Sequence, residues 1–280
     1  MESNTISIGN SIQKKVLFTS FVIIVVIGVI LVFGHFVVRV NGKLMLANKS
    51  SLEISGSKVT DNDLKNLKYL THLQELYLIA TFNITDISFI NEMKELKTLS
   101  IESQNITNID LIGNCQSLET IRLFFTNLTD LDFIANNNNL RTLDIYTGNP
   151  VHDISGLKNM KKIECLSIKS SELKDITPIG SLENLTILRL SCSSVNDFSP
   201  LLGCKKLKTL FLSECEQFTD ISLLTALENL EELSIIGIQV SDYTPLLYIP
   251  NLKNVVVKEG QIDSTLITQL ISQNIAVEII

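Results

Sequence analysis

The sequence of 280 residues has few of the side chains on which most catalytic sites depend. It contains only three histidines, His35, His72 and His152. None of them has a nucleophile at a motif spacing, and no glycine-rich phosphate loop or zinc-binding pattern occurs. We therefore expect no enzyme, no cofactor and no metal. Loss of an activity on mutation of His152 would reverse this expectation.

Cysteine is also sparse, and its spacing fits neither a metal site nor a disulfide framework. Cys115 and Cys204 occupy one position of the repeat described below, where other copies have methionine or leucine. We interpret both as core residues. Cys192 and Cys215 lie in neighbouring copies but one position out of step, so a bond between them is the less favoured alternative.

Positive charge is scarce outside the N-terminal region. Residues 1–43 have four basic side chains and one acidic side chain, a local charge of +3, in a chain of net charge −7. The remaining residues therefore have a net charge of −10. Such an acidic body argues against nucleic acid as a partner.

Long uncharged runs are absent except near the N-terminus. Residues 16–38 are 23 uncharged, mostly β-branched or aromatic residues. A helix of this length spans about 35 Å, more than the ~30 Å hydrocarbon core of a bilayer. We predict a transmembrane helix over 16–38. A cleavable signal peptide is the alternative, but its apolar stretch is normally about 7–15 residues and no convincing cleavage site follows.

The flanking charges do not decide the orientation of this run, because basic residues lie on both sides. Lys14 and Lys15 precede it, and Arg39, Lys43 and Lys49 follow it. A short tail ahead of a first hydrophobic helix is similar to a bacterial signal anchor. We therefore expect a single-pass protein of the cell membrane with extracellular repeats. The reverse topology is the alternative.

One repeating pattern dominates the chain after residue 72. Nine copies of 22 or 23 residues begin at Leu73, Leu96, Leu118, Leu140, Ile163, Leu185, Leu207, Leu230 and Leu252. The first, fourth and sixth residues of each copy are aliphatic, as in Leu185, Leu188 and Leu190. The fourth and sixth point to one side of a short strand, and a single copy buries too little apolar surface to fold alone. The pattern predicts stacked leucine-rich repeats.

We predict an α/β solenoid, a leucine-rich-repeat horseshoe or arc. A parallel β-sheet forms its concave face, and short helices, 3-10 turns and loops form its convex face. The expected segments are a polar tail (1–15), the transmembrane helix (16–38), a stem (39–51), an N-terminal cap (52–72), the repeats (73–251), and a last repeat with a C-terminal cap (252–280).

Seven aspartates recur after the strands: Asp86, Asp130, Asp153, Asp175, Asp197, Asp220 and Asp242. Pro178, Pro200 and Pro245 follow three of them at the same spacing. An acceptor side chain shortly before proline is typical of the start of a helical turn, so we interpret the aspartates as caps. A calcium ladder is the alternative, although no second carboxylate recurs. Asn137 replaces a buried apolar residue, and we expect its copy to be poorly packed or bulged outward.

The period, the aliphatic triplets and the segments ITDI (Ile84–Ile87), ITPI (Ile176–Ile179) and SPLL (Ser199–Leu202) resemble the internalin-type leucine-rich repeats of bacterial surface proteins. The resemblance extends from about residue 52 to the C-terminus. It implies the fold but not the ligand, because the family binds different partners with one scaffold. The asparagine usual three residues after the triplet is missing, and no cell-wall sorting signal follows the repeats. A role in host-cell invasion is not implied.

The outward residues of the strands form the concave surface that such proteins commonly use for binding. The candidate ligand-binding residues are Arg122, Phe124, Phe125, Asp144, Tyr146, Arg189 and Phe211. Exposed aromatics beside arginine are typical of protein-binding hot spots. The alternative is that Arg122 and Asp144 merely pair across neighbouring strands while the aromatics cover the sheet.

These observations favour a membrane-anchored binding protein whose exported repeats recognise a protein, or a cell-envelope polymer, through the concave sheet. The alternative is an intracellular leucine-rich-repeat scaffold or regulator of another protein.

Overall fold

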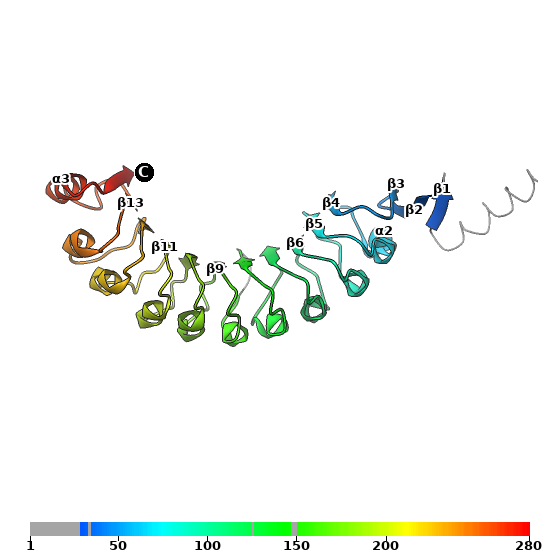
Figure 1. The fold of residues 1–280 in the computed structure, drawn as a ribbon, viewed down its shortest axis with the longest axis horizontal. Helices are drawn as coiled ribbons and strands as arrows, with labels where there is room; N and C mark the ends of the chain where they lie inside the picture. Colours follow the sequence, from blue (N-terminus) through cyan, green and yellow to red (C-terminus); the bar gives the residue numbers. More distant parts are fainter. Residues whose placement is uncertain (1–28, 33–34, 125, 147–149) are drawn as a thin grey trace, which may run out of the picture.

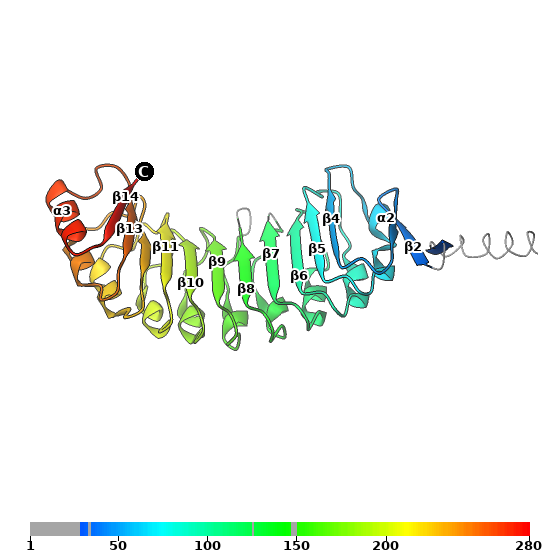
Figure 2. The ribbon, with the colours of Figure 1, turned by 45° about the horizontal axis from the view of Figure 1, so that its top comes forward.

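The computed structural model describes residues 29–32, 35–124, 126–146 and 150–280. Its main body is an arc built on one parallel sheet of eleven strands, which follow one another in sequence order from β4 to β14. Figure 1 shows the strands along the inner side of the arc and the helical turns along its outer side. Figure 2 shows the strands side by side. The predicted solenoid with a concave parallel sheet is confirmed.

The strands of this sheet are short and recur once per copy. They are β4 (Ser51–Ser55), β5 (Glu75–Ile79), β6 (Thr98–Glu102), β7 (Thr120–Phe124), β8 (Thr142–Ile145), β9 (Cys165–Lys169), β10 (Ile187–Ser191), β11 (Thr209–Ser213), β12 (Glu232–Ser234), β13 (Asn254–Val257) and β14 (Ala276–Ile279). The convex side has 3-10 turns: η1 (Leu67–Tyr69), η2 (Ser88–Glu92), η3 (Ile109–Asn114), η4 (Asp132–Ile134), η5 (Ser155–Leu157), η6 (Thr177–Ser181), η7 (Ser199–Gly203), η8 (Ile221–Ala226) and η9 (Thr244–Tyr248). Helices α2 (Asp61–Leu64) and α3 (Ser264–Ser272) lie toward the two ends of the arc.

The core lies between the sheet and the convex turns. Leu188 and Leu190 on β10 are at most 1% exposed. Leu188 pairs in register with Leu166 on β9 and with Leu210 on β11. Because the strands are parallel and in register, equivalent leucines stack from copy to copy. The buried apolar residues form one cluster that extends through all copies.

The seven aspartates lie at the start of the convex turns. One carboxylate oxygen of each accepts the backbone N–H two residues further on, at 2.7–3.2 Å. The prediction that they are caps is confirmed, because these N–H groups belong to the first or second residue of each turn and have no partner within it. In the described part of the chain, no group of three or more His, Cys, Asp or Glu side chains is placed to hold a metal ion.

Asn137 does not bulge outward, so that part of the expectation is wrong. The side chain is fully buried, and its Nδ2 donates to the carbonyl oxygens of Ile112 (3.2 Å) and Cys115 (2.9 Å). The preceding turn thus supplies acceptors at the place where other copies have an apolar contact. Oδ1 finds no hydrogen-bond partner among the described residues, so the polar side chain is only half satisfied.

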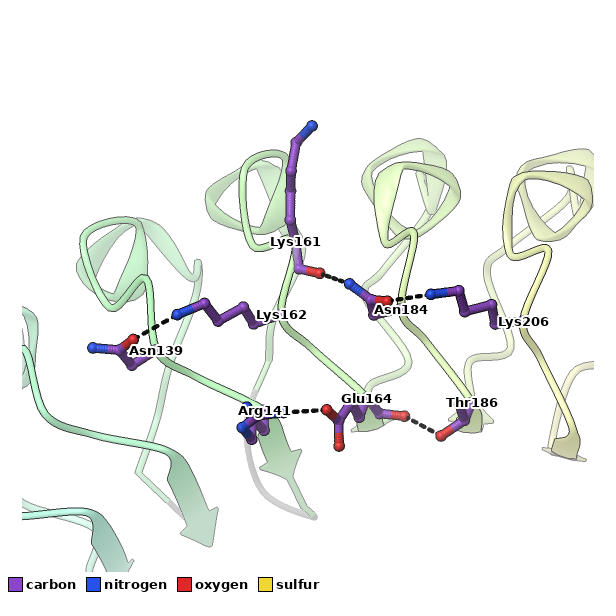
Figure 3. A network of polar contacts seen from close by, with 8 residues as sticks. All are labelled: Asn139, Arg141, Lys161, Lys162, Glu164, Asn184, Thr186 and Lys206. Atoms are coloured by element: carbon purple, nitrogen blue, oxygen red, sulfur yellow. Dashed lines mark hydrogen bonds and ion pairs between the residues drawn. The ribbon is translucent and has the colours of Figure 1, made fainter.

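An asparagine ladder is present, but at a position that the sequence analysis did not consider. Four asparagines stand one residue before the first leucine of a copy, and each Nδ2 donates to a carbonyl oxygen of the preceding copy at 2.6–3.0 Å. They are Asn139, Asn184, Asn229 and Asn251. Figure 3 shows Asn184 bonded to the Lys161 carbonyl on one side and to Lys206 Nζ on the other. The ladder ties successive copies together where the chain enters each strand.

The N-terminal end differs from the expectation. The strands β1 (Val29–Val32), β2 (His35–Val40) and β3 (Lys43–Leu46) form a separate antiparallel sheet in the order β1-β2-β3. The transmembrane helix predicted over 16–38 is therefore wrong for residues 29–32 and 35–38. Residues 16–28 lie outside the described residues. The segment expected as a stem contains the end of β2 and all of β3.

Packing against the cap explains why this part of the apolar run is extended. Val38 and Val40 are fully buried in the same apolar cluster as the repeats. The Arg39 carbonyl between them accepts a hydrogen bond from Asn66 Nδ2 at 2.8 Å. β-branched residues also favour strands. Within the ranges that the structure describes, no helix is long and apolar enough to cross a bilayer.

The cysteines are free thiols. Cys115, Cys192, Cys204 and Cys215 are buried, whereas Cys165 is half-buried. Burial raises the pKa of the Cys115 thiol to about 11 and the pKa of the Cys204 thiol to about 12. The interpretation of Cys115 and Cys204 as core residues is confirmed.

Candidate binding site on the concave sheet

Five side chains, one from each of the strands β7 to β11, lie in one row across the sheet, and four of them are candidate residues. Arg122 on β7 pairs in register with Asp144 on β8, and Asp144 pairs with Ser167 on β9. The row continues from Ser167 to Arg189 on β10 and to Phe211 on β11. In-register parallel strands place equivalent positions side by side on one face, so these side chains share the concave surface. We call this set, together with the adjacent stack of Phe124 on Tyr146, the concave row.

Arg122 and Asp144 form an ion pair inside the row. Arg122 Nε lies 3.1 Å from Asp144 Oδ2, and the side chains are 39% and 7% exposed. The carboxylate is thus largely removed from water and is compensated by the guanidinium. The alternative that these two residues pair across neighbouring strands is confirmed. They shape the row, but they do not offer a free charge of either sign.

Phe124 and Tyr146 stack beside this ion pair. Their ring centroids are 4.5 Å apart and the ring planes differ by 5°. Burial, followed by the charge of the Asp144 carboxylate, raises the pKa of the Tyr146 hydroxyl, which therefore stays protonated at neutral pH. Both rings are half-buried. They form an apolar platform whose rotamers are held by mutual contact.

Arg189 differs from Arg122 because the residue is exposed and is not part of an ion pair among the described residues. It lies over the Phe211 ring, with Cζ 4.9 Å from the ring centroid, and Nη1 is 3.5 Å from the Cys165 sulfur. Among the described residues, no carboxylate lies within ion-pair distance of Arg189. The contacts with the Phe211 ring and the Cys165 sulfur therefore position its side chain.

A second polar cluster lies at the edge of the row. Lys169 Nζ is 2.7 Å from Glu214 Oε1, and the Ser191 hydroxyl donates to Glu214 Oε2 at 2.8 Å. These contacts, with that of Lys169 the largest, lower the pKa of the Glu214 carboxyl. The carboxylate near the end of β11 is thereby occupied by Lys169. Among the residues that the structure describes, Arg189 is thus left without an acidic partner.

The structure places five of the seven candidate residues on strands β7 to β11, and Tyr146 directly follows the end of β8. Arg122 contacts Asp144, Phe124 stacks on Tyr146, and Arg189 covers Phe211. The list is completed by Phe125, which lies outside the described residues. Cys165, Lys169 and Glu214 were not among the residues predicted from the sequence to bind a ligand. Lys169 occupies the position in its copy that Tyr146 occupies in the copy before. This equivalence could have identified Lys169 from the sequence.

The comparisons with known proteins agree with this architecture. The family profile "Leucine Rich repeats (2 copies)" matches residues 116–159, which include β7 and β8. None of the curated proteins matches the sequence.

Several solved structures have a similar fold. An internalin (InlF) from Listeria monocytogenes is 22% identical with a TM-score of 0.63, and the alignment covers 85% of each chain. An internalin C2 from the same organism is 27% identical with a TM-score of 0.52, covering 74% of this chain and 80% of that one. A leucine-rich-repeat protein from Leptospira interrogans is 18% identical with a TM-score of 0.50, covering 76% and 68%. Residues 116–159 thus match a leucine-rich-repeat family, and the fold of the chain is similar to that of internalins.

Proposed function

We propose that the concave row binds a protein partner, with Arg189 as the charged anchor and the Phe124–Tyr146 stack as the apolar platform. The observation that supports this most directly is the exposed residue Arg189, which has no carboxylate partner in the described part of the chain. Arginine binds a carboxylate through two parallel hydrogen bonds, so an aspartate, a glutamate or a chain end of the partner fits this position.

The arrangement of the neighbouring side chains lowers the entropy cost of binding. The Phe124–Tyr146 stack and the Arg189–Phe211 contact hold three rings and one guanidinium in defined positions before a partner arrives. Side chains that are already ordered lose little further rotamer freedom on binding. Aromatic and arginine side chains of this kind dominate the energetics of protein interfaces. The internalin-like fold adds support, because its concave sheet is wide and continuous.

The test is a comparison of variants of the full chain as bait against an envelope fraction and a cytosolic fraction. The charge reversal Arg189→Glu should weaken capture of the bound protein by about tenfold or more, and Tyr146→Ala should weaken it as well. Lys205→Glu, the same charge reversal at an exposed residue beside the convex turn η7, should not. Equal capture by Arg189→Glu, Tyr146→Ala and the unmodified chain would reject the concave row as the site.

We also propose that the repeats are exported and held near a membrane. The support is sequence alone: Lys14 and Lys15 precede an apolar run, of which residues 16–28 lie outside the described fold. Basic residues before such a run are typical of export and anchoring signals. Protease treatment of intact cells should cleave the repeats. Full protection of the repeats would instead favour the intracellular scaffold or regulator.

A further inference from the structure

The outer face of the β2–β3 hairpin carries two exposed leucines. Leu44 is paired in register with Arg39, and Leu46 with Val37. Directly opposite residues of antiparallel strands point to the same face. Val38 and Val40 alternate with these positions and are fully buried, so Leu44 and Leu46 point away from the core.

The exposure of these two side chains is large for leucine. Leu44 is 53% exposed and Leu46 is 48% exposed. The other large apolar side chains that are exposed in the described residues lie on other elements: Ile79, Tyr248, Ile271, Ile279 and Ile280. Val37, opposite Leu46 on the same face, is buried, so this face is open at Leu44 and Leu46 and covered at Val37. The two leucines of β3 form the exposed apolar patch.

Basic residues flank the patch: Arg39 lies directly opposite Leu44 on the same face, Lys43 precedes Leu44 beside the hairpin turn, opposite Val40, and Lys49 follows β3. Residues 37–50 include three basic side chains, Arg39, Lys43 and Lys49, and no acidic one, in a chain whose net charge is −7. All three are exposed, and none forms an ion pair within the described ranges. The patch thus combines two exposed leucines with unpaired cations in an otherwise acidic protein. This combination complements an anionic lipid bilayer, in which an apolar interior lies beneath negatively charged headgroups.

We propose that Leu44 and Leu46, together with Arg39, Lys43 and Lys49, form a surface that rests on an anionic lipid bilayer. The leucines enter the boundary between headgroups and acyl chains, and the cations contact lipid phosphates. The connectivity of the chain favours lipid over a protein partner, because β1, next to β2 in the same sheet, follows the uncharged residues 16–28 in sequence. This surface is separate from the concave row, so neither proposal depends on the other.

The position of the hairpin is compatible with simultaneous binding on the concave sheet. Figure 1 shows β1, β2 and β3 at one end of the arc, with α3 and the C-terminus at the other end. A bilayer in contact with the hairpin would touch this end of the solenoid. The strands β7 to β11, which carry the concave row, lie in the middle of the arc and stay open.

The absence of tryptophan from the sequence allows a direct test on the full chain. Leu46→Trp introduces a single fluorescent reporter into the patch. In vesicles of phosphatidylcholine and phosphatidylglycerol, its emission should shift to the blue. Acyl chains brominated near the headgroup should quench it by about twofold or more. Tyr248→Trp is the matched control, because Tyr248 lies on η9 in the last convex turn and is 70% exposed. Its emission should stay unquenched.

Charge reversal separates lipid contact from other causes of a blue shift. In the Leu46→Trp background, the double variant Lys43→Glu, Lys49→Glu should lower the quenching. Vesicles of phosphatidylcholine alone should also lower it. The reason is the same in both cases, because each basic side chain strengthens contact with an anionic surface by about fivefold. Equal quenching in both vesicle types would overturn the proposal. Blue-shifted emission that brominated lipid does not quench would also overturn it, because protein, such as residues 16–28 or a second copy, would then cover the patch.

Discussion

Each of the seven aspartates accepts a hydrogen bond from a backbone N–H at the start of a convex turn. Protonation of these carboxylates makes the free energy of unfolding depend on pH. Hydrogen bonds from the serine or threonine two positions later lower the pKa of five of them, Asp86, Asp153, Asp175, Asp197 and Asp220. The unfolded chain then binds protons more readily than the folded chain. The free energy of unfolding should therefore be highest above the unfolded aspartate pKa of about 3.9 and fall as the pH drops through the lower folded values. Urea unfolding at a series of pH values between neutral and strongly acidic measures this slope.

Asparagine provides the control for the acid prediction. An asparagine at position 197 or 220 still offers an oxygen to the N–H of Ser199 or Ser222, which Asp197 and Asp220 now bind at 2.8 Å. The double variant Asp197→Asn, Asp220→Asn should stay folded at neutral pH and lose stability less steeply in acid. An unchanged acid slope in this variant would show that other groups cause the pH dependence.

Among the elements, the convex turns η6 and η7 pack so closely that they need glycine. A Cβ added at Gly203 would overlap the carbonyl oxygen of Gly180, and one added at Gly180 would lie 2.8 Å from that of Pro200. The obstacle is backbone, so it cannot rotate away. Gly203→Ala should lower the free energy of unfolding by about 1–3 kcal/mol, as measured by chemical denaturation. Ala226→Gly on η8, at the equivalent position, is the control and should cost less than about 1 kcal/mol. Equal losses in the two variants would contradict the steric explanation.

The strands of the repeats could be predicted because their signal is local and repeated. Leu188 and Leu190 stand in an aliphatic triplet that recurs every 22 or 23 residues, and only a stacked strand buries such a triplet in every copy. The hairpin of β2 and β3 could not be predicted in this way. Apolar content alone does not distinguish a membrane helix from a buried strand, and the contacts that bury Val38 and Val40 come from residues distant in sequence.

The candidate site was predictable to a similar, limited extent. Residues at the same position of neighbouring copies meet across in-register strands, so the Arg122–Asp144 pair and the Phe124–Tyr146 stack follow from the spacing. The Lys169–Glu214 ion pair does not, because it joins residues two copies apart. Glu214 reaches Lys169 from beyond the end of β11, where its backbone has a left-handed φ of 53°. A periodic pattern contains no information about such a turn.

At the scale of the whole molecule, the solenoid separates its surfaces along one axis. The basic hairpin lies at the N-terminal end of the arc, the concave row in the middle, and the cap of α3 and β14 at the other end. Asp263 caps α3 through the Leu266 N–H at 2.8 Å. Ile279, which is 49% exposed, lies on β14, the edge strand of the sheet. Because each copy contacts only its neighbours, a change at one end need not disturb the others.

This separation predicts local rather than global loss of structure after damage to one copy. Leu210 on β11 is fully buried and pairs in register with Leu188 on β10 and Leu233 on β12. Leu210→Ala should cost about 2–5 kcal/mol, because a cavity remains in a core that cannot close around it. Since coupling passes only between adjacent copies, hydrogen exchange followed by mass spectrometry should speed up in β10 to β12 and stay unchanged in β5 and β6. A uniform increase from β5 to β13 would instead mean that the arc unfolds as one unit, and the lipid-facing end and the concave row would then lose their structure together.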